Sequence, residues 1–231
     1  MKDGELLVTF NADFSPNVLP RDRPAPVTIE IHGNVATTDG SHPPPLRRLE
    51  VALNRNGRLF TKGLPVCRPA LLQSTNTEIA LNRCRGALVG QGRFRAQVML
   101  EREIPAAGKI LAFNSRTNGK QSLILHFFAA APVRFTLVAP LTIGRRKEGE
   151  FGTLLRAKIP RLVGDLGSVT EIDLKIGKRY FFAGKQRSYI SAACATSPNL
   201  EIGFFPFTRA TFRFKEHRKI EETLFRTCRV R

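Results

Sequence analysis

The chain has no tryptophan, only two tyrosines and two methionines, and few acidic residues. Its 19 Asp and Glu residues stand against 37 Lys and Arg residues, so the 231-residue chain carries a formal net charge of +18. Such an excess favours polyanionic partners, namely nucleic acid, anionic lipid or an acidic cell-wall polymer, and says nothing about the fold. The alternative is a basic composition without a specific partner. Hydrophobic residues make up 42% of the chain, which excludes a wholly disordered protein.

Zinc and thioredoxin-like motifs are also missing, because none of the four cysteines belongs to a CxxC pair. Their order suggests sequential pairing, Cys67 with Cys84 and Cys194 with Cys228, although four cysteines allow three connectivities. Each bond would contribute roughly 3 to 4 kcal/mol to stability in the loop-entropy model. Oxidised pairs imply export, whereas four buried free thiols would fit a cytosolic protein.

The segment Met1–Glu5 is charged and lacks the apolar stretch of a signal peptide. A trimmed signal, a misplaced start or a protein that stays inside the cell would each explain this. We favour trimming, and we expect a secreted or cell-surface protein. The most apolar segment, Leu123–Ile143, contains Arg134 and two prolines, so it predicts two strands rather than a transmembrane helix.

Short alternating runs separated by Pro, Gly and Asp-Gly turns predict an all-β protein. In one such run Phe94, Ala96 and Val98 share one face, while Arg93 and Arg95 share the other. The expected strands are Leu6–Phe10, Val27–His32, Leu49–Leu53, Phe94–Leu100, Ile110–Asn114, Ser122–Phe128, Val133–Val138, Thr153–Ile159, Ile172–Ile176, Tyr189–Ala192, Leu200–Phe205, Thr208–Lys215 and Thr223–Thr227.

One short helix is expected near residues 75–85. Thr75 and Glu78 fit a capping box, with Thr75 as the N-cap, and Gly86 is placed to end the helix. Cys84 would lie in the last turn, where a bond to Cys67 would pin the helix to the preceding strand.

The apolar junction at Ala129–Pro132 divides the chain into two halves with hints of an internal repeat. Residues 1–131 are predicted to form a β-sandwich with the short disulfide-pinned helix, and residues 132–231 a second sandwich. The preferred architecture is therefore two tandem Ig-like β-sandwich domains. One extended β-sandwich is the alternative.

No catalytic, cofactor-binding or metal-binding constellation stands out, and none is predicted. The four histidines are not spaced as in HExxH or a zinc finger. Asp39, Ser41 and His42 carry the residue types of a hydrolytic triad, but neighbouring positions do not converge as a triad must. Carboxylates across a cleft, which a glycosidase needs, cannot be recognised from sequence.

Basic residues alternate with apolar ones on several expected strands, so a basic face should point outward. Such faces can bind a polyanion through phosphate, sulfate or carboxylate contacts, although a solvated face that discourages edge pairing is the plainer explanation. Specific nucleic-acid binding is not favoured, because neither exposed aromatics nor a groove-reading motif is recognisable. The candidate anion-binding residues are Arg93, Arg95, Arg145, Arg146, Lys147, Arg209, Arg213 and Lys215.

Five segments resemble a group of uncharacterised exported bacterial β proteins that contain disulfides and have no established activity. The resemblance implies export and paired cysteines, supplies no catalytic residues, and extends to the late Cys194 and Cys228. The missing signal segment departs from the group. The segments are Pro26–Gly33, Thr38–Pro44, Gly63–Cys67, Cys84–Gly90 and Leu111–Asn114.

Together these features lead us to expect a non-enzymatic exported or cell-surface protein with a binding or structural role. Its expected partner is an anionic envelope polymer or another envelope protein. A hydrolase acting on envelope polysaccharide and a structural module of a larger assembly are the competing hypotheses.

Overall fold

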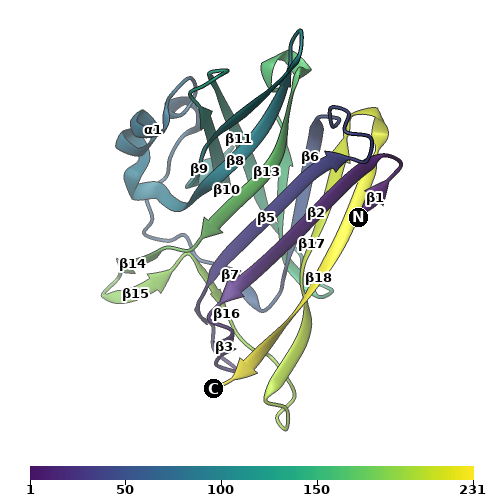
Figure 1. The fold of residues 1–231 in the computed structure, drawn as a ribbon. Helices are drawn as coiled ribbons and strands as arrows, with labels where there is room; N and C mark the ends of the chain where they lie inside the picture. The colour runs from purple at the N-terminus through teal and green to yellow at the C-terminus, as the bar shows by residue number, and fades with distance from the viewer.

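The computed structural model describes all residues 1–231, and most of them lie in strands (Figure 1). Thirteen strands form one sheet, in which almost all neighbours are antiparallel. Its order is β1 (Lys2–Asp3), β2 (Leu6–Ser15), β5 (Thr28–Thr37), β13 (Gly167–Ile176), β8 (Leu88–Met99), β9 (Glu103–Thr117), β10 (Lys120–Ala129), β11 (Phe135–Arg145), β12 (Phe151–Lys158), β6 (Leu46–Asn54), β17 (Ile202–Phe214), β18 (Lys219–Val230) and β3 (Val18–Leu19).

Two smaller sheets and a few helical turns complete the chain. A three-stranded sheet joins β4 (Ala25–Pro26), β16 (Ile190–Ala192) and β7 (Gly57–Leu59), and a hairpin joins β14 (Arg179–Phe182) to β15 (Lys185–Ser188). The helical elements are α1 (Thr77–Cys84) and the 3-10 turns Pro69–Leu71, Arg85–Ala87, Val163–Asp165 and Lys215–His217.

The all-β prediction is confirmed, and every expected strand overlaps an observed one. The expected strands Leu200–Phe205 and Thr208–Lys215 are parts of one long strand, β17. The apolar segment 123–143 forms the antiparallel pair β10 and β11. No helix has the length and apolar character needed to cross a membrane.

The two halves of the chain are interleaved in the large sheet, which differs from the expected pair of tandem sandwiches. Strand β13 lies between β5 and β8, and β6 lies between β12 and β17. One core of 37 buried residues draws on both halves. Residue 131 therefore separates neither two sheets nor two cores. Alternation within a strand specifies which side chains are buried, but it does not specify the partner strand.

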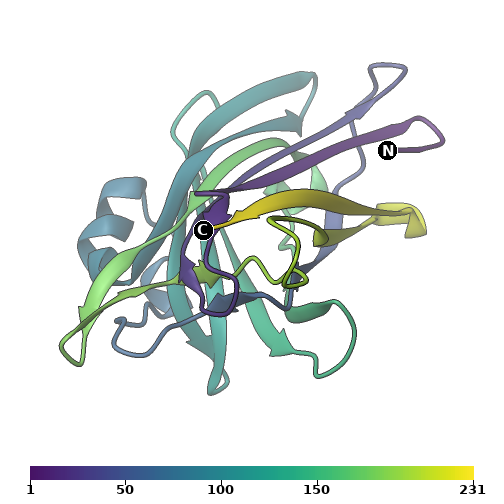
Figure 2. The same ribbon diagram turned by 90° about the horizontal axis from the view of Figure 1, so that it is seen from below.

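The sheet curls until its two ends meet. Alternate residues of β2 point into the core, and so do alternate residues of β17 and β18. Figures 1 and 2 show β2 and β18 coming side by side although they stand at opposite ends of the strand order. Side chains rather than a backbone ladder join them there. Arg226 of β18 donates a hydrogen bond to the Asp13 carboxylate of β2 at 2.6 Å and another to the side-chain amide oxygen (Oδ1) of Asn11.

Residues 64–87 form a second layer over the outer faces of β9 and β10. The layer and the two strands bury a second apolar cluster, which includes Leu72, Ala80, Phe113 and Ile124. Hence β9 and β10 are covered on both faces, which explains why their sequences are nearly continuous apolar runs.

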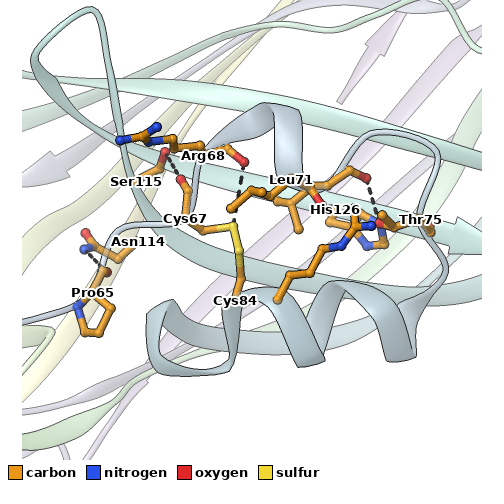
Figure 3. Close-up of a disulfide and its surroundings, with 11 residues drawn as sticks. Pro65, Cys67, Arg68, Leu71, Thr75, Cys84, Asn114, Ser115 and His126 are labelled. Carbon is orange, nitrogen blue, oxygen red and sulfur yellow. Dashed lines mark hydrogen bonds between the residues drawn. A yellow bond between two sulfur atoms is a disulfide. The ribbon is translucent and has the colours of Figure 1, made fainter.

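A disulfide between Cys67 and Cys84 fastens this layer across helix α1 (Figure 3). Backbone and side-chain bonds from β9 hold the same segment, because Asn114 donates to the Pro65 carbonyl and Ser115 to the Cys67 carbonyl. The second disulfide joins Cys194 to Cys228 of β18. Both predicted pairings are present in the structure.

The N-cap of α1 is Asn76 rather than the expected Thr75. The Asn76 side chain accepts a hydrogen bond from the backbone N–H of Ile79. Thr75 is buried instead, and its hydroxyl donates to the Leu72 carbonyl and lies 3.0 Å from Nε2 of His126. The capping pattern predicted the position of the helix correctly. Thr75 is not the N-cap because its side chain contacts His126 of β10 instead.

Loss of a disulfide should destabilise the protein through loop entropy. We expect the double substitution Cys194→Ala and Cys228→Ala, which opens a 34-residue separation, to lower the free energy of unfolding by about 4 kcal/mol. The Cys67→Ala and Cys84→Ala pair, with a separation of 17, should cost about 3 kcal/mol. Urea unfolding without reductant measures both. A wild-type unfolding curve that does not change on reduction would contradict the pairing.

His126 is fully buried between β10 and the outer layer. Its Nε2 lies 3.2 Å from the Thr75 carbonyl, while Nδ1 has no hydrogen-bond partner within the protein. Burial lowers the pKa of His126 below its ordinary value of 6.5. Below about pH 6.5 the unfolded chain therefore binds a proton that the folded protein does not.

Because of this difference, the contribution of neutral His126 is complete above pH 6.5 and is lost as the pH falls below it. The free energy of unfolding should drop by up to about 1.4 kcal/mol per pH unit in that window. Urea unfolding of wild type and His126→Gln between pH 7.5 and 5 measures it. The variant should show the shallower dependence, and equal slopes would refute this assignment.

Candidate anion-binding surface

Three groups of basic residues were expected to face outward, and the structure places them on different parts of the molecule. Arg93 and Arg95 lie on β8, and Arg209 and Arg213 on β17. The run Arg145–Lys147 ends β11 and begins the turn to β12. Lys215 lies in the turn between β17 and β18. The eight candidates therefore do not form one site.

Carboxylates pair with the basic residues on the outer face of β8. Arg93 lies 3.4 Å from Asp173 of β13, and Arg95 lies 3.6 Å from Glu171. The Asp173 carboxylate also lies 2.8 Å from Nδ1 of His32, and this bond is the first cause of its lowered pKa. The adjoining surface depression of about 720 Å³ contains Asp13, Glu30 and Asp173 beside Arg93, Lys109 and Lys175. Its charges are close to balanced, so it is a weak candidate for anion binding.

The carboxylates of this depression are also unsuited to donating a proton. Asp13 is paired with Arg226 at 2.6 Å and Glu30 with Lys175 at 2.6 Å. A general acid needs a raised pKa, whereas that of Asp173 is lowered. This face therefore offers no support for the polysaccharide hydrolase alternative.

On the outer face of the sheet, four cations follow a line across four neighbouring strands. Lys158 of β12 is directly opposite Arg48 of β6. Arg48 is opposite Arg213 of β17, and Arg213 is opposite Lys219 of β18. Side chains opposite one another in a sheet project from the same face. We call Lys158, Arg48, Arg213 and Lys219 the basic row.

The alternation that produces this row is the one expected from the sequence. Ala210, Phe212 and Phe214 of β17 are buried in the core, so Arg209 and Arg213 point to the other side. The same rule applies to β12, where Ala157 is buried and Lys158 is exposed. Of the row only Arg213 was predicted; Arg48, Lys158 and Lys219 were missed, because their clustering depends on which strands pair.

Few acids neutralise the basic row. Lys219 is 3.3 Å from Glu221, whereas none of the recorded ion pairs contains Lys158, Arg48 or Arg213. Glu50, on the same face of β6, is already taken by Arg156 at 2.8 Å and Arg146 at 3.6 Å. Like charges directly opposite in a sheet repel one another, so the row costs stability.

A shallow depression of about 710 Å³ lies along the basic row, and Glu50 is the one carboxylate in its lining. Four basic residues line it, namely Arg48, Arg156, Lys158 and Arg213. Arg209 lies nearby on β17, with its guanidinium 4.9 Å from the centre of the Phe151 ring. The face thus combines exposed cations with a concave surface.

Lys215 is not part of the basic row. It lies close to Asp165, whose pKa is lowered first by hydrogen bonds from Arg47 and to a smaller degree by the charges of Arg161 and Lys215. Arg47 binds both oxygens of Asp165, at 2.7 and 2.6 Å. This pair is a partly buried structural contact between β6 and the turn before β13.

The run Arg145–Lys147 belongs to a separate cavity at one end of the curled sheet, where the turns after β6 and β11 come together. Its further basic lining residues, Arg55, Arg58 and Arg187, were not among the predicted candidates. Only the fold brings them near Arg145, because they come from the turn after β6, from β7 and from β15.

Exposed aromatic rings, which were not expected, occur on β17 and β18. Phe204 and Phe225 are 70% and 48% exposed, and their rings stack at 5.2 Å with an interplanar angle of 7°. They pair with each other, so one face of each ring is occupied. Leu200 and Ile202 extend this exposed apolar area.

If the cations of the basic row repel one another, removing one of their charges should stabilise the fold. We expect Arg48→Gln to raise the free energy of unfolding by a few tenths of a kcal/mol at low salt, and the gain should vanish in high salt. Arg156→Gln, which loses its bond to Glu50, is the control and should not gain. Urea unfolding at two salt concentrations tests this. A loss of stability in Arg48→Gln at low salt would show that the row is not repulsive.

Comparison of the chain with protein-family models, curated proteins and solved structures found no match. The resemblance to exported bacterial β proteins therefore stays a prediction. The two disulfides fit an oxidising compartment such as the extracellular space. Inferences about function therefore depend on the charges and geometry of the basic row and of the cavity around Arg145.

Proposed function

We propose that this chain is a non-enzymatic exported protein, secreted or held at the cell surface, that binds an anionic envelope polymer. The binding surface is the outer face of β12, β6, β17 and β18. One observation carries the proposal: four cations stand opposite one another across four strands, and three of them lack a carboxylate partner.

A linear array favours an extended ligand. Neighbouring strands are about 4.8 Å apart, so the row spans about 14 Å from β12 to β18. A single small anion could contact only part of that length. A chain with a negative charge on each repeating unit could contact every member, and the release of its counterions would favour binding at low salt.

Acidic polysaccharide suits this surface better than single-stranded nucleic acid. Proteins that hold single strands combine a basic groove with aromatic rings on which the bases stack. No aromatic residue lines the depression beside the row. The exposed Phe204 and Phe225 stack on each other. Disulfides also suit an oxidising compartment, where envelope polymers are found.

The exposed apolar area around Phe204 and Phe225 favours a second candidate function, a structural module that associates with another envelope protein. Such a module would use the apolar area and would not need the basic row. Polymer binding and association should therefore respond to different substitutions.

Retention on an immobilised acidic polysaccharide tests the proposal. Wild-type protein should bind a polygalacturonate column at low salt and elute as salt rises, because each contact with a carboxylate of the polymer releases counterions. The triple variant Arg48→Gln, Lys158→Gln and Arg213→Gln should bind at least tenfold more weakly, with a shallower salt dependence.

The matched control is Arg93→Gln, Arg95→Gln and Lys175→Gln, which removes the same net charge from the ion-paired face. This control should stay close to wild type. Equal loss in both variants would mean that only bulk charge matters, and no retention at low salt would overturn the proposal. Tighter binding of single-stranded DNA, weakened by Phe204→Ser, would assign the surface to nucleic acid instead.

A further inference from the structure

The cavity at the end of the curled sheet, a broad depression that is open to solvent, is separate from the basic row and has a different chemistry. It measures about 900 Å³, and six cations line it without any acidic side chain. They come from segments far apart in the sequence: Arg55, Arg58, Arg145, Arg146, Lys147 and Arg187. Of these, only Arg146 has a carboxylate partner, Glu50 at 3.6 Å.

Backbone contacts hold the walls of this cavity in place. The N–H of Arg55 donates to the Glu150 carbonyl at 2.8 Å, and that of Arg146 donates to the Gly152 carbonyl at 3.0 Å. A side chain at Gly152 would approach the Cα of Arg55 to 3.0 Å, so the two turns are in close contact. Asn54 fixes the first turn by accepting from the N–H of Asn56. These contacts hold together the two turns that carry Arg55 and Arg146.

Two buried donors in the lining have no acceptor within the protein. They are Nε of Arg187 and Nε2 of Gln121. The Arg187 guanidinium is placed by stacking over the Phe60 ring, 5.2 Å from its centre. A buried donor without an acceptor is costly, and an oxyanion would supply several acceptors at once. Guanidinium groups match the oxygens of phosphate and sulfate especially well.

The rest of the lining indicates what carries the anion. Six of the 19 lining residues carry an amide or hydroxyl group, among them Asn56, Gln186 and Ser191, and only three are hydrophobic. Such a wall suits a polyhydroxylated molecule and offers little to a lipid chain. The volume exceeds that of an inorganic ion and leaves room for a sugar ring.

We propose that this cavity binds the phosphate or sulfate ester of a sugar, with Arg145 and Arg187 on the oxyanion. Gln121 donates a further hydrogen bond, and the neutral amides and hydroxyls contact the sugar hydroxyls. The site does not depend on polymer binding at the basic row, because it uses different side chains at the opposite ends of β11 and β12.

Calorimetric titration at low salt tests the site, with glucose 6-phosphate, glucose 6-sulfate, inorganic phosphate and glucose as the probes. One equivalent of at least one ester should bind, and glucose alone should not. Arg145→Gln with Arg187→Gln should raise the dissociation constant at least tenfold. The matched control, Arg179→Gln with Lys185→Gln, lies on the β14–β15 hairpin outside the cavity lining and should bind as wild type.

Loss of Arg187 also removes its contact with Phe60. A second variant, Gln121→Leu, leaves that contact intact and should bind the sugar ester several-fold more weakly than wild type. The triple variant of the basic row should bind the two sugar esters as wild type does, which separates this site from the polymer surface. No binding of either ester by wild type, or equal binding by the Arg145 and Arg187 variant, would overturn the proposal. Inorganic phosphate binding as tightly as the esters would overturn the assignment to a sugar.

Discussion

The structure depends on one constraint: a single large sheet must hide the apolar face of every strand. Most strands alternate, so one face is rich in Leu, Val and Phe and the other is polar, whereas β9 and β10 are apolar on both faces. No second sheet of comparable size is present to cover the apolar face, and the sheet therefore curls over itself around a core of 37 residues. The arginine that joins β18 to β2 and the disulfide at Cys228 serve this closure, while the outer layer covers the second apolar face of β9 and β10.

The same constraint decides where the charge goes. With one face of the sheet turned inward, basic side chains can project only from the outer face or from the turns at its ends. On β8 the partner strand supplies carboxylates, and the charge is neutralised. On β12, β6 and β17 the partner strands supply more cations, and the charge accumulates. Repulsion of this kind is tolerated in proteins where a ligand later relieves it, which is the physical basis of both proposed sites.

Much of the fold could be predicted from residues alone. Alternation located the strands, and the order of the cysteines predicted both disulfides. Strand partners could not be predicted, because β13 inserts between β5 and β8 through long-range pairing that leaves no local signal. For the same reason the outward direction of Arg213 was predictable, while its position beside Arg48 was not. Likewise Arg187 lies on the β14–β15 hairpin, which was not among the expected strands, and only the fold brings it to the Arg145 cavity.

The outer layer, residues 64–87, determines how the protein responds to reducing conditions. The run Leu123–Phe128 is uncharged apart from His126, rich in β-forming residues and free of proline, which is the composition of aggregation-prone segments. Residues 64–87 cover Ile124 and His126 on one of its faces, and the Cys67–Cys84 bond holds that cover together. Reduction would let the cover detach while the curled sheet persists. The outer face of β9 and β10 would then be an exposed hydrophobic surface. Self-association through this surface should therefore precede global unfolding.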